Sequence, residues 1–278
     1  MPREKSPVFL KWAGGKGSLI KHYLRYFPAE GERYFEPFVG SAAVFFKVRE
    51  RFKRIELSDS NAELINCYLM VRDQLEPLMK LLAMHQEAHK KEHYYVVREM
   101  DRGGNLTTLY SPLQRAARFI YLNKTCYNGL WRVNRHGFFN VPMGRYRNPP
   151  ILRPEVLTLA SQALQGVTIA QRDFLSIEPI TAAGDVIYLD PPYDPLTKTS
   201  SFTAYSTAPF GDAEQTALAD LYRRLDAHGC ILLLSNSDTP FVRDLYSGYK
   251  IVPIKARRAI NTRADRRGEI AELLIVNR

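Results

Sequence analysis

Apolar positions along the chain alternate between short strand-like runs and longer stretches with helical spacing. The clearest run, Val186–Asp190, is rich in β-branched and aromatic residues and stops at two prolines, which is typical of a buried strand. Similar runs predict a strand that leads into Pro37 and strands at 54–59, 167–170, 230–236, 251–254 and 271–276. Helical spacing occurs at 19–26, 44–48 and 213–227, the last with Asp212 as a candidate cap and Gly229 as its end. This alternation predicts an α/β fold.

A different pattern occupies the middle of the chain. From about Ala62 to Tyr121 the apolar spacing is helical, with a break at Gly103–Asn105. Turn signals at Asn128-Gly129 and His136-Gly137 follow, and they predict a β-hairpin formed by 130–135 and 138–141. We therefore expect a main domain built from 1–61 and 153–278, with 62–152 inserted as a helical and hairpin domain.

Size and composition are those of a folded globular protein. The chain has 278 residues, of which 45% are hydrophobic and 24% are charged, so it can bury a substantial core. No apolar run approaches the roughly 20 residues that cross a bilayer, and the first residues lack the apolar segment of a signal peptide. The three cysteines are widely separated, which favours neither a zinc site nor a disulfide framework and suits a reducing cytoplasm.

The net charge of +10 is concentrated in one interval. Between Asp101 and Glu155 there is no acidic residue, and the interval contains nine basic ones: Arg102, Arg115, Arg118, Lys124, Arg132, Arg135, Arg145, Arg147 and Arg153. Solvated surfaces usually mix the two signs. An acid-free interval with interspersed aromatic and amide side chains favours a polyanionic partner, because each neutralised phosphate releases counterions. The pattern indicates nucleic acid.

The strand that ends in Asp190-Pro191-Pro192-Tyr193 carries the strongest candidate chemistry. In open α/β sheets ligands bind at the carboxyl ends of the strands, which is where this segment places a carboxylate, a peptide carbonyl and an aromatic ring. The competing interpretation is a strand followed by a proline turn whose acid is only solvated.

Two upstream segments have the layout of a nucleotide-binding turn. Gly14-Gly15-Lys16 precedes a helical pattern but lacks the earlier glycine and the following Ser or Thr of a phosphate loop, so we do not expect a nucleoside triphosphatase. Gly40 follows a predicted strand, and Asp59 ends the next one at a spacing that suits a carboxylate bound to ribose hydroxyls. Asp59 has a second possible role, as the N-cap of a helix at 61–70.

The remaining features are weaker. His85, His89 and His93 are spaced as on one side of a single helix, and we expect a solvated helix face in preference to a metal site; no metal is predicted. The segment Thr197–Phe210 is too long for an ordinary connection and is expected to form a functional loop. A basic loop is expected at Arg257–Arg267.

Three motifs in chain order around the basic insertion resemble those of Dam-type DNA adenine-N6 methyltransferases, which act within GATC. These motifs are Phe9–Lys16, Glu36–Gly40 and Asp190–Tyr193. Further matching stretches extend the resemblance over nearly the whole chain: 127–130, 139–142, 144–146, 202–205 and 257–258. Ala42, where such proteins often carry a second glycine, and Lys124–Cys126 depart from the pattern.

The resemblance implies a Rossmann-like, S-adenosylmethionine-dependent methyltransferase domain with an inserted DNA-recognition domain at 62–152. Catalysis would involve Asp190, Pro191, Pro192 and Tyr193. The cofactor would be bound by Trp12, Lys16, Phe38, Asp59, Asp173, Phe174 and Asp190. Duplex DNA would be bound by Tyr127 as an intercalating wedge, by Asn128, Leu130, Arg132 and Pro142 at base edges, and by Arg145 at phosphate.

These residue types suit the reaction. The exocyclic amine of adenine is a poor nucleophile because its lone pair is delocalised, and oxygen acceptors at Asp190 and Pro191 would favour a localised pair. Tyr193 would stack on the flipped base, whereas Tyr127, Phe138 and Phe139 have an alternative role as core aromatics, which we expect for the two phenylalanines.

We expect a monomeric cytoplasmic enzyme that acts on GATC in double-stranded DNA, with possible links to DNA replication and mismatch repair. The alternatives are a cytosine-N4 methyltransferase and an inactive DNA-binding relative.

Overall fold

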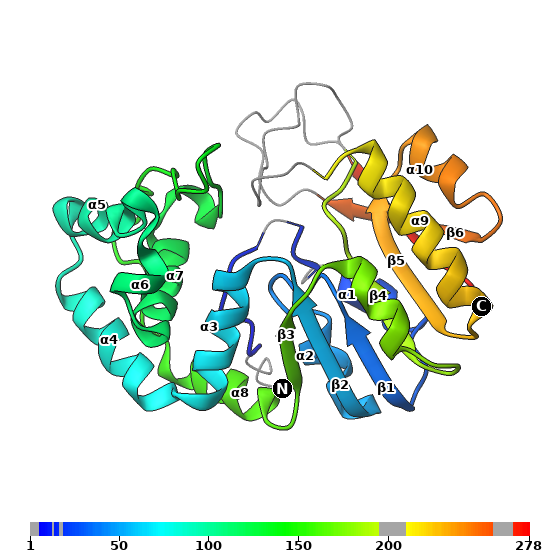
Figure 1. Ribbon diagram of the computed structural model, residues 1–278, viewed down its shortest axis with the longest axis horizontal. Helices are drawn as coiled ribbons and strands as arrows, with labels where there is room; N and C mark the ends of the chain where they lie inside the picture. The colour runs from blue at the N-terminus through cyan, green and yellow to red at the C-terminus, as the bar shows by residue number, and fades with distance from the viewer. Residues whose placement is uncertain (1–5, 13, 17–18, 195–209, 258–268) are drawn as a thin grey trace.

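The computed structural model describes residues 6–12, 14–16, 19–194, 210–257 and 269–278 (Figure 1). The expected loop at Thr197–Phe210 lies outside these residues except for Phe210, and the basic loop at Arg257–Arg267 lies outside them except for Arg257 and its strand. The 202–205 stretch of the resemblance is outside them as well. No helix in the described ranges is both long enough and apolar enough to span a bilayer.

The described strands form one seven-stranded sheet. In chain order they are β1 Gly31–Glu36, β2 Phe52–Asp59, β3 Thr168–Gln171, β4 Val186–Leu189, β5 Ile231–Ser237, β6 Lys250–Arg257 and β7 Glu269–Val276. Their spatial order is β3-β2-β1-β4-β5-β7-β6, with β7 antiparallel to both of its neighbours and the other pairs parallel. The α/β fold is thereby confirmed, and every strand expected from the apolar runs is present.

The order of the strands reverses between β1 and β4. These two strands pair in parallel, with Tyr34 opposite Val186 and Phe35 opposite Ile187. Their carboxyl ends therefore lie side by side and bring Glu36 and Asp190 to the same edge of the sheet. In open α/β sheets such a reversal opens the crevice in which ligands bind.

Helices flank the sheet and fill the central part of the chain. Their bounds are α1 Ile20–Tyr23, α2 Phe45–Val48, α3 Ala62–Asp73, α4 Leu75–Glu87, α5 Lys91–Glu99, α6 Leu106–Leu109, α7 Pro112–Thr125, α8 Pro154–Leu164, α9 Asp212–Ala227 and α10 Pro240–Leu245. Short 3-10 turns occur at η2 Arg49–Arg51, η3 Arg102–Gly104, η4 Tyr127–Gly129 and η5 Phe174–Ile180. In Figure 1, α4 to α7 gather on one side of the molecule and α9 lies over the sheet on the other.

Capping residues explain several helix boundaries. Ser111 starts α7 with a reciprocal capping box to Gln114. Gly229 ends α9 with a φ of +82°, as expected for its left-handed position. Asp212, however, is the first residue of α9 and Gly211 is its N-cap, so the expected cap was one residue out. The helix expected at 19–26 is the single turn α1, and the helical pattern did not predict α8 or α10.

Two apolar clusters cover opposite faces of the sheet because successive strand residues point to opposite sides. In β4, Val186 and Tyr188 belong to one cluster, and Ile187 and Leu189 to the other. The first cluster continues without a break through α3, α4, α5, α7 and α8. Helix α3 contacts β2 and β3 as well as α7, so it links the sheet with the central helices.

The expected hairpin is present but has no regular strands. Val133 forms an isolated antiparallel bridge with Phe139, and the Asn140 N–H donates to the Arg132 carbonyl at 3.1 Å. Phe139 is fully buried, as expected, but Phe138 is only half-buried and Tyr127 is 47% exposed. Of the two phenylalanines, only Phe139 is therefore in the core.

A buried carboxylate fastens the hairpin to the helices. Asp101 Oδ2 accepts the Phe139 N–H at 2.8 Å and pairs with the Arg118 guanidinium at 2.8 Å, while Oδ1 accepts from Arg102 at 2.8 Å. Arg118 is 2% exposed and also donates to the carbonyls of Val97 and Arg98. This cluster ties α5, α7 and the hairpin together.

The three histidines do not form a solvated helix face, so that expectation was wrong. Helix α4 ends at Glu87 and α5 begins at Lys91, which places the histidines on two helices and their turn. His85 Nδ1 lies 3.0 Å from His93 Nε2, and His89 Nδ1 lies 2.9 Å from the Tyr121 hydroxyl. The three rings pack around Tyr121, and each is half-buried.

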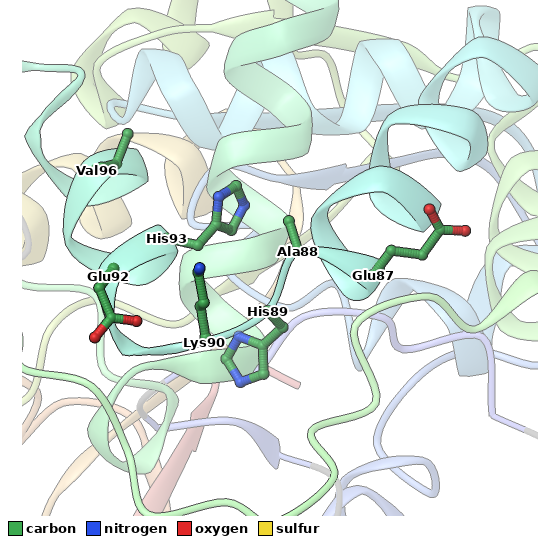
Figure 2. A pocket seen from close by; sticks show the side chains of 7 residues that line it. All are labelled: Glu87, Ala88, His89, Lys90, Glu92, His93 and Val96. Carbon is green, nitrogen blue, oxygen red and sulfur yellow. The ribbon is translucent and has the colours of Figure 1, made fainter.

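A surface pocket opens at this turn. Figure 2 shows its lining, which consists of Glu87, Ala88, His89, Lys90, Glu92, His93 and Val96. Among the described residues, no three His, Cys, Asp or Glu side chains gather as a metal ion would require. The pocket belongs to the α4–α5 turn, which lies at the left of Figure 1 and away from β4 in the sheet.

Burial of His85 predicts a loss of stability in acid. Burial and the neighbouring His93 lower the pKa of His85 to about 4, against an unfolded value near 6.5. The unfolded chain therefore binds the proton first, and the contribution of the neutral ring is complete above about pH 6.5 and is lost as pH falls toward 4. At pH 5 the loss is about 2 kcal/mol.

Urea unfolding at pH 7.5 and pH 5 measures this loss, with His85→Gln as the test variant and exposed His228→Gln as the control. The difference between the two pH values should shrink in His85→Gln and stay unchanged in His228→Gln. Equal pH dependence in the wild type and His85→Gln would assign the acid sensitivity to other groups.

Candidate active site

Asp190 lies directly after β4, where two side chains bind one of its carboxylate oxygens. Its Oδ1 pairs with Lys16 Nζ at 2.7 Å and accepts from the Ser235 hydroxyl at 2.7 Å. Lys16 is 2% exposed and also donates to the Gly14 carbonyl at 2.6 Å. Within the described chain no hydrogen bond occupies Asp190 Oδ2, and the side chain retains 20% exposure. The acid is thus a fixed acceptor with one oxygen available, and the interpretation of a merely solvated turn is wrong.

The backbone of the Asp190–Asp194 turn is held from β5 and α9. Buried Gln215 donates to the Pro192 carbonyl at 2.9 Å, and Asn236 bonds both Gln215 and the Asp194 N–H. Among the described residues, no group donates a hydrogen bond to the Pro191 carbonyl. The turn therefore presents one carbonyl next to Asp190 and keeps the following one occupied.

Tyr193 is oriented by two contacts. Its hydroxyl donates to Glu272 Oε2 at 2.8 Å, and Lys16 Nζ lies 4.5 Å from the centre of its ring. Burial, with Asp190 and Glu272 beside it, raises the pKa of the Tyr193 hydroxyl well above its usual value. The group therefore remains a proton donor at neutral pH.

Glu36 is a buried acid at the end of β1 that the sequence interpretation did not single out. The Tyr34 hydroxyl donates to its Oε2 at 2.7 Å. Burial raises the pKa of Glu36 to about 8, with the charge of Asp190 acting in the same direction. An acid that ends a strand just before a proline was the available signal, since Asp190 has the same arrangement.

The turn after β1 packs tightly against Trp12 and β2. Gly40 has a φ of +46°, and a Cβ there would lie 2.7 Å from the Trp12 ring, so only glycine fits. The Gly40 N–H donates to Asp59 Oδ2 at 3.3 Å. Ala42 has a φ of +56°, in the left-handed region that glycine adopts without strain.

Asp59 is not the cap of the following helix. Asn61 is the N-cap of α3 and accepts from the Leu64 N–H, whereas Asp59 Oδ1 accepts from the Asn61 N–H at 3.0 Å. Burial raises the pKa of Asp59 to about 6. The carboxylate therefore braces the turn after β1 from the end of β2, and its capping interpretation was wrong.

An aromatic wall lies beside this turn. Phe38 stacks on Phe174 with ring centres 5.4 Å apart, and Phe210 contacts both rings. Asp173 is exposed and caps η5 by accepting from the Leu175 N–H at 2.9 Å. A flat aromatic surface next to a carboxylate suits a purine ring.

The residues expected at DNA lie around η4 and the hairpin. Tyr127, Asn128, Pro142 and Arg145 are exposed, while Leu130 and Arg132 are half-buried. Asn128 adopts a φ of +55°, which turns the chain sharply beside Tyr127, and the Tyr127 N–H donates to the Pro142 carbonyl at 2.9 Å. Arg132 is steadied by Asn140 at 2.9 Å.

This group is joined to the amino-terminal segment. The buried amide of Asn123 accepts the Lys11 N–H at 2.9 Å and donates to the Lys11 carbonyl at 2.7 Å and to the Gly129 carbonyl at 3.3 Å. Lys11 also lies over the Tyr146 ring at 4.5 Å. The segment that carries Trp12 and Lys16 is therefore fixed directly to the turn that carries Tyr127.

Comparison with known proteins assigns the family. Residues 12–260 match the D12 class N6 adenine-specific DNA methyltransferases. Similar proteins include a type II methyltransferase, M.MjaIII, of Methanocaldococcus jannaschii, with 42% identity over 97% of this chain and 98% of the relative. Another is M1.LlaDCHI of Lactococcus lactis, with 38% identity over 97% and 94%. A DNA adenine methylase of Serratia marcescens has 37% identity over 99% and 100%.

The family match includes β1 to β6, the aromatic wall, the helices and the segment that holds Asp190, and it selects adenine over the cytosine-N4 alternative. The chain belongs to the D12 class of N6 adenine-specific DNA methyltransferases.

Proposed function

We propose that this DNA adenine methyltransferase uses S-adenosylmethionine, flips its target adenine out of the duplex and acts within GATC. The observation that carries the proposal is the pair of available acceptors, Asp190 Oδ2 and the Pro191 carbonyl, beside the Tyr193 ring at the reversal of strand order. The GATC assignment rests on the resemblance of the basic insertion, and DNA as substrate follows from the family.

The two acceptors suit the two hydrogens of an exocyclic amine. Lys16 and Ser235 hold Asp190 Oδ1, so the carboxylate cannot rotate freely and Oδ2 stays directed away from them. Hydrogen bonds to both N6 hydrogens strengthen as positive charge develops on nitrogen, and this lowers the barrier. Asp190 is thus a fixed acceptor, and no proton needs to reach it before transfer.

Reaching these acceptors requires an extrahelical base. The acceptors follow β4 at the carboxyl edge of the sheet, and the amine of a base that is still stacked in a duplex cannot reach them there. The partly exposed Tyr193 side chain offers a stacking surface that would offset part of the unstacking cost of a few kcal/mol. Exposed Tyr127 would fill the space left in the duplex.

The residues around Gly40 fit the cofactor. Trp12 closes one side of the Gly40 turn, Asp59 would accept from ribose hydroxyls, and the wall of Phe38 and Phe174 with Asp173 would hold the adenine ring. Bound there, S-adenosylmethionine would supply an electrophilic methyl sulfonium. Lys16 contacts both Asp190 and the Tyr193 ring, so the two ligands would meet beside it.

The insertion at 62–152 would bind the duplex as a DNA-recognition domain. Asn128, Leu130, Arg132 and Pro142 would face base edges, and Arg145 would pair with phosphate. One copy contains the acceptors, the cofactor residues and the DNA group, so we propose a monomer that works in the cytoplasm.

Methyl labelling tests the proposal. The protein is incubated with tritiated S-adenosylmethionine and a duplex that contains one GATC, or the same duplex with GGCC in place of GATC, in which both A·T pairs have become G·C pairs. We expect label only in the first duplex, and we expect it to be recovered as N6-methyladenine after digestion. Equal labelling of both duplexes would contradict the site, and label recovered as methylcytosine would contradict the chemistry.

A further inference from the structure

Glu272 holds the Tyr193 hydroxyl together with the neighbouring Tyr23 hydroxyl, and it reaches the site from the antiparallel part of the sheet. Its Oε2 accepts from Tyr193 at 2.8 Å and from the Tyr23 hydroxyl at 3.0 Å. Glu272 lies on β7 opposite Ser237 of β5, and the Ser237 hydroxyl donates to the Asp194 carbonyl at 2.7 Å. Strands β5 and β7 therefore hold the two ends of the Tyr193–Asp194 segment.

The bond to Glu272 differs in kind from the other contacts of this turn. Ser235 fixes a carboxylate, while Gln215 and Asn236 fix backbone groups. None of these contacts determines how the Tyr193 ring is rotated about its side-chain torsions. Only the hydroxyl anchor does so, together with the Lys16 ammonium over one ring face at 4.5 Å.

Orientation of this ring matters because stacking requires two parallel planes. A base that stacks on Tyr193 takes its tilt from the ring, and its exocyclic nitrogen must at the same time meet Asp190 Oδ2 and the Pro191 carbonyl. Small errors in such an arrangement are costly, since a displacement of 1 Å can lower a rate by about 100-fold. The bond to Glu272 fixes the Tyr193 ring at its hydroxyl end, and a preorganised site requires side chains that are fixed in this way.

We infer that Glu272 is a positioning residue for methyl transfer, which acts through the Tyr193 hydroxyl to set the plane on which the target adenine stacks. The inference rests on the proposed stacking of the base on Tyr193. Glu272 itself touches neither substrate nor reacting atoms. The Tyr23 hydroxyl on α1 donates to the same Glu272 oxygen as Tyr193 and steadies the carboxylate.

A double-mutant cycle tests this inference, with Glu272→Ala, Tyr193→Phe and the double variant. The substrate is unmethylated DNA amplified in vitro, which contains adenine in every sequence context, so that a failure of the GATC assignment would not affect the test. We expect each single variant to lower the single-turnover rate of methyl transfer by about 10- to 100-fold, with Kd for DNA unchanged within about threefold. We expect the double variant to be no slower than the slower single variant, because both changes remove the same bond.

Two further variants separate positioning from folding. Glu272→Gln keeps an acceptor oxygen for the Tyr193 hydroxyl and should recover most of the rate. Glu32→Ala removes a glutamate of β1 that pairs with Lys53 on the surface, and it should leave the rate unchanged. Multiplicative losses in the double variant, or a wild-type rate in Glu272→Ala, would overturn the inference. A Glu272→Gln variant as slow as Glu272→Ala would do the same.

Discussion

Replacement of Asp190 by alanine should lower the rate of methyl transfer by about 10²- to 10³-fold while leaving the affinity for DNA within about threefold. The loss follows from the geometry, because the variant removes Oδ2 and leaves the Pro191 carbonyl as the single acceptor at the turn. Single-turnover transfer and equilibrium binding to a labelled duplex measure the two quantities separately.

The ion pair with Lys16 determines the controls for this experiment. Alanine leaves a lysine that is 2% exposed without its carboxylate partner, and a buried unpaired charge can cost about 3–5 kcal/mol of stability. Asp190→Asn keeps the shape and an acceptor oxygen, so thermal unfolding of both variants separates chemistry from folding. A folded variant with wild-type turnover would remove Asp190 from the mechanism.

Replacement of Asp101 by alanine should destabilise the fold by about 3–5 kcal/mol. The change leaves the guanidinium of Arg118, 2% exposed, without its carboxylate and the buried Phe139 N–H without an acceptor. Urea unfolding measures the loss of free energy, which is a large share of the 5–15 kcal/mol of a typical domain.

Asp220→Ala is the matched control, since Asp220 forms an ion pair with Arg223 on the exposed face of α9 and both partners are about half-exposed. Such pairs contribute at most about 1 kcal/mol. Equal destabilisation by Asp101→Ala and Asp220→Ala would mean that the buried cluster does not support the hairpin.

The apolar runs and prolines determined most of the fold in advance. Strand interiors such as Val186–Leu189 are recognisable because continuous burial leaves only apolar side chains, and Asp190 followed because two prolines end the strand. These predictions succeeded because strand burial and proline geometry depend on neighbouring residues in the sequence.

The side-chain partners could not be read in the same way. His85 and His93 meet because the chain turns after Glu87, and Lys16 meets Asp190 although the two residues are far apart in the sequence. Glu272 was missed as a site residue for the same reason, since its contact with Tyr193 depends on strands that pair only in three dimensions. Periodicity identifies elements, whereas contacts between elements depend on topology.

The pairing of β1 with β4 also determines when the site can come into existence. Tyr34 faces Val186 in the sheet, and all of α3 to α8 is made between the two strands. During synthesis β1 therefore cannot pair with β4 until α3 to α8 have left the ribosome. Contacts of such long sequence separation form slowly. The central helices share an apolar core with the sheet, so β1 can pack against them before β4 is made. The order of synthesis thus places the central helices first and the sheet edge that carries Asp190 last.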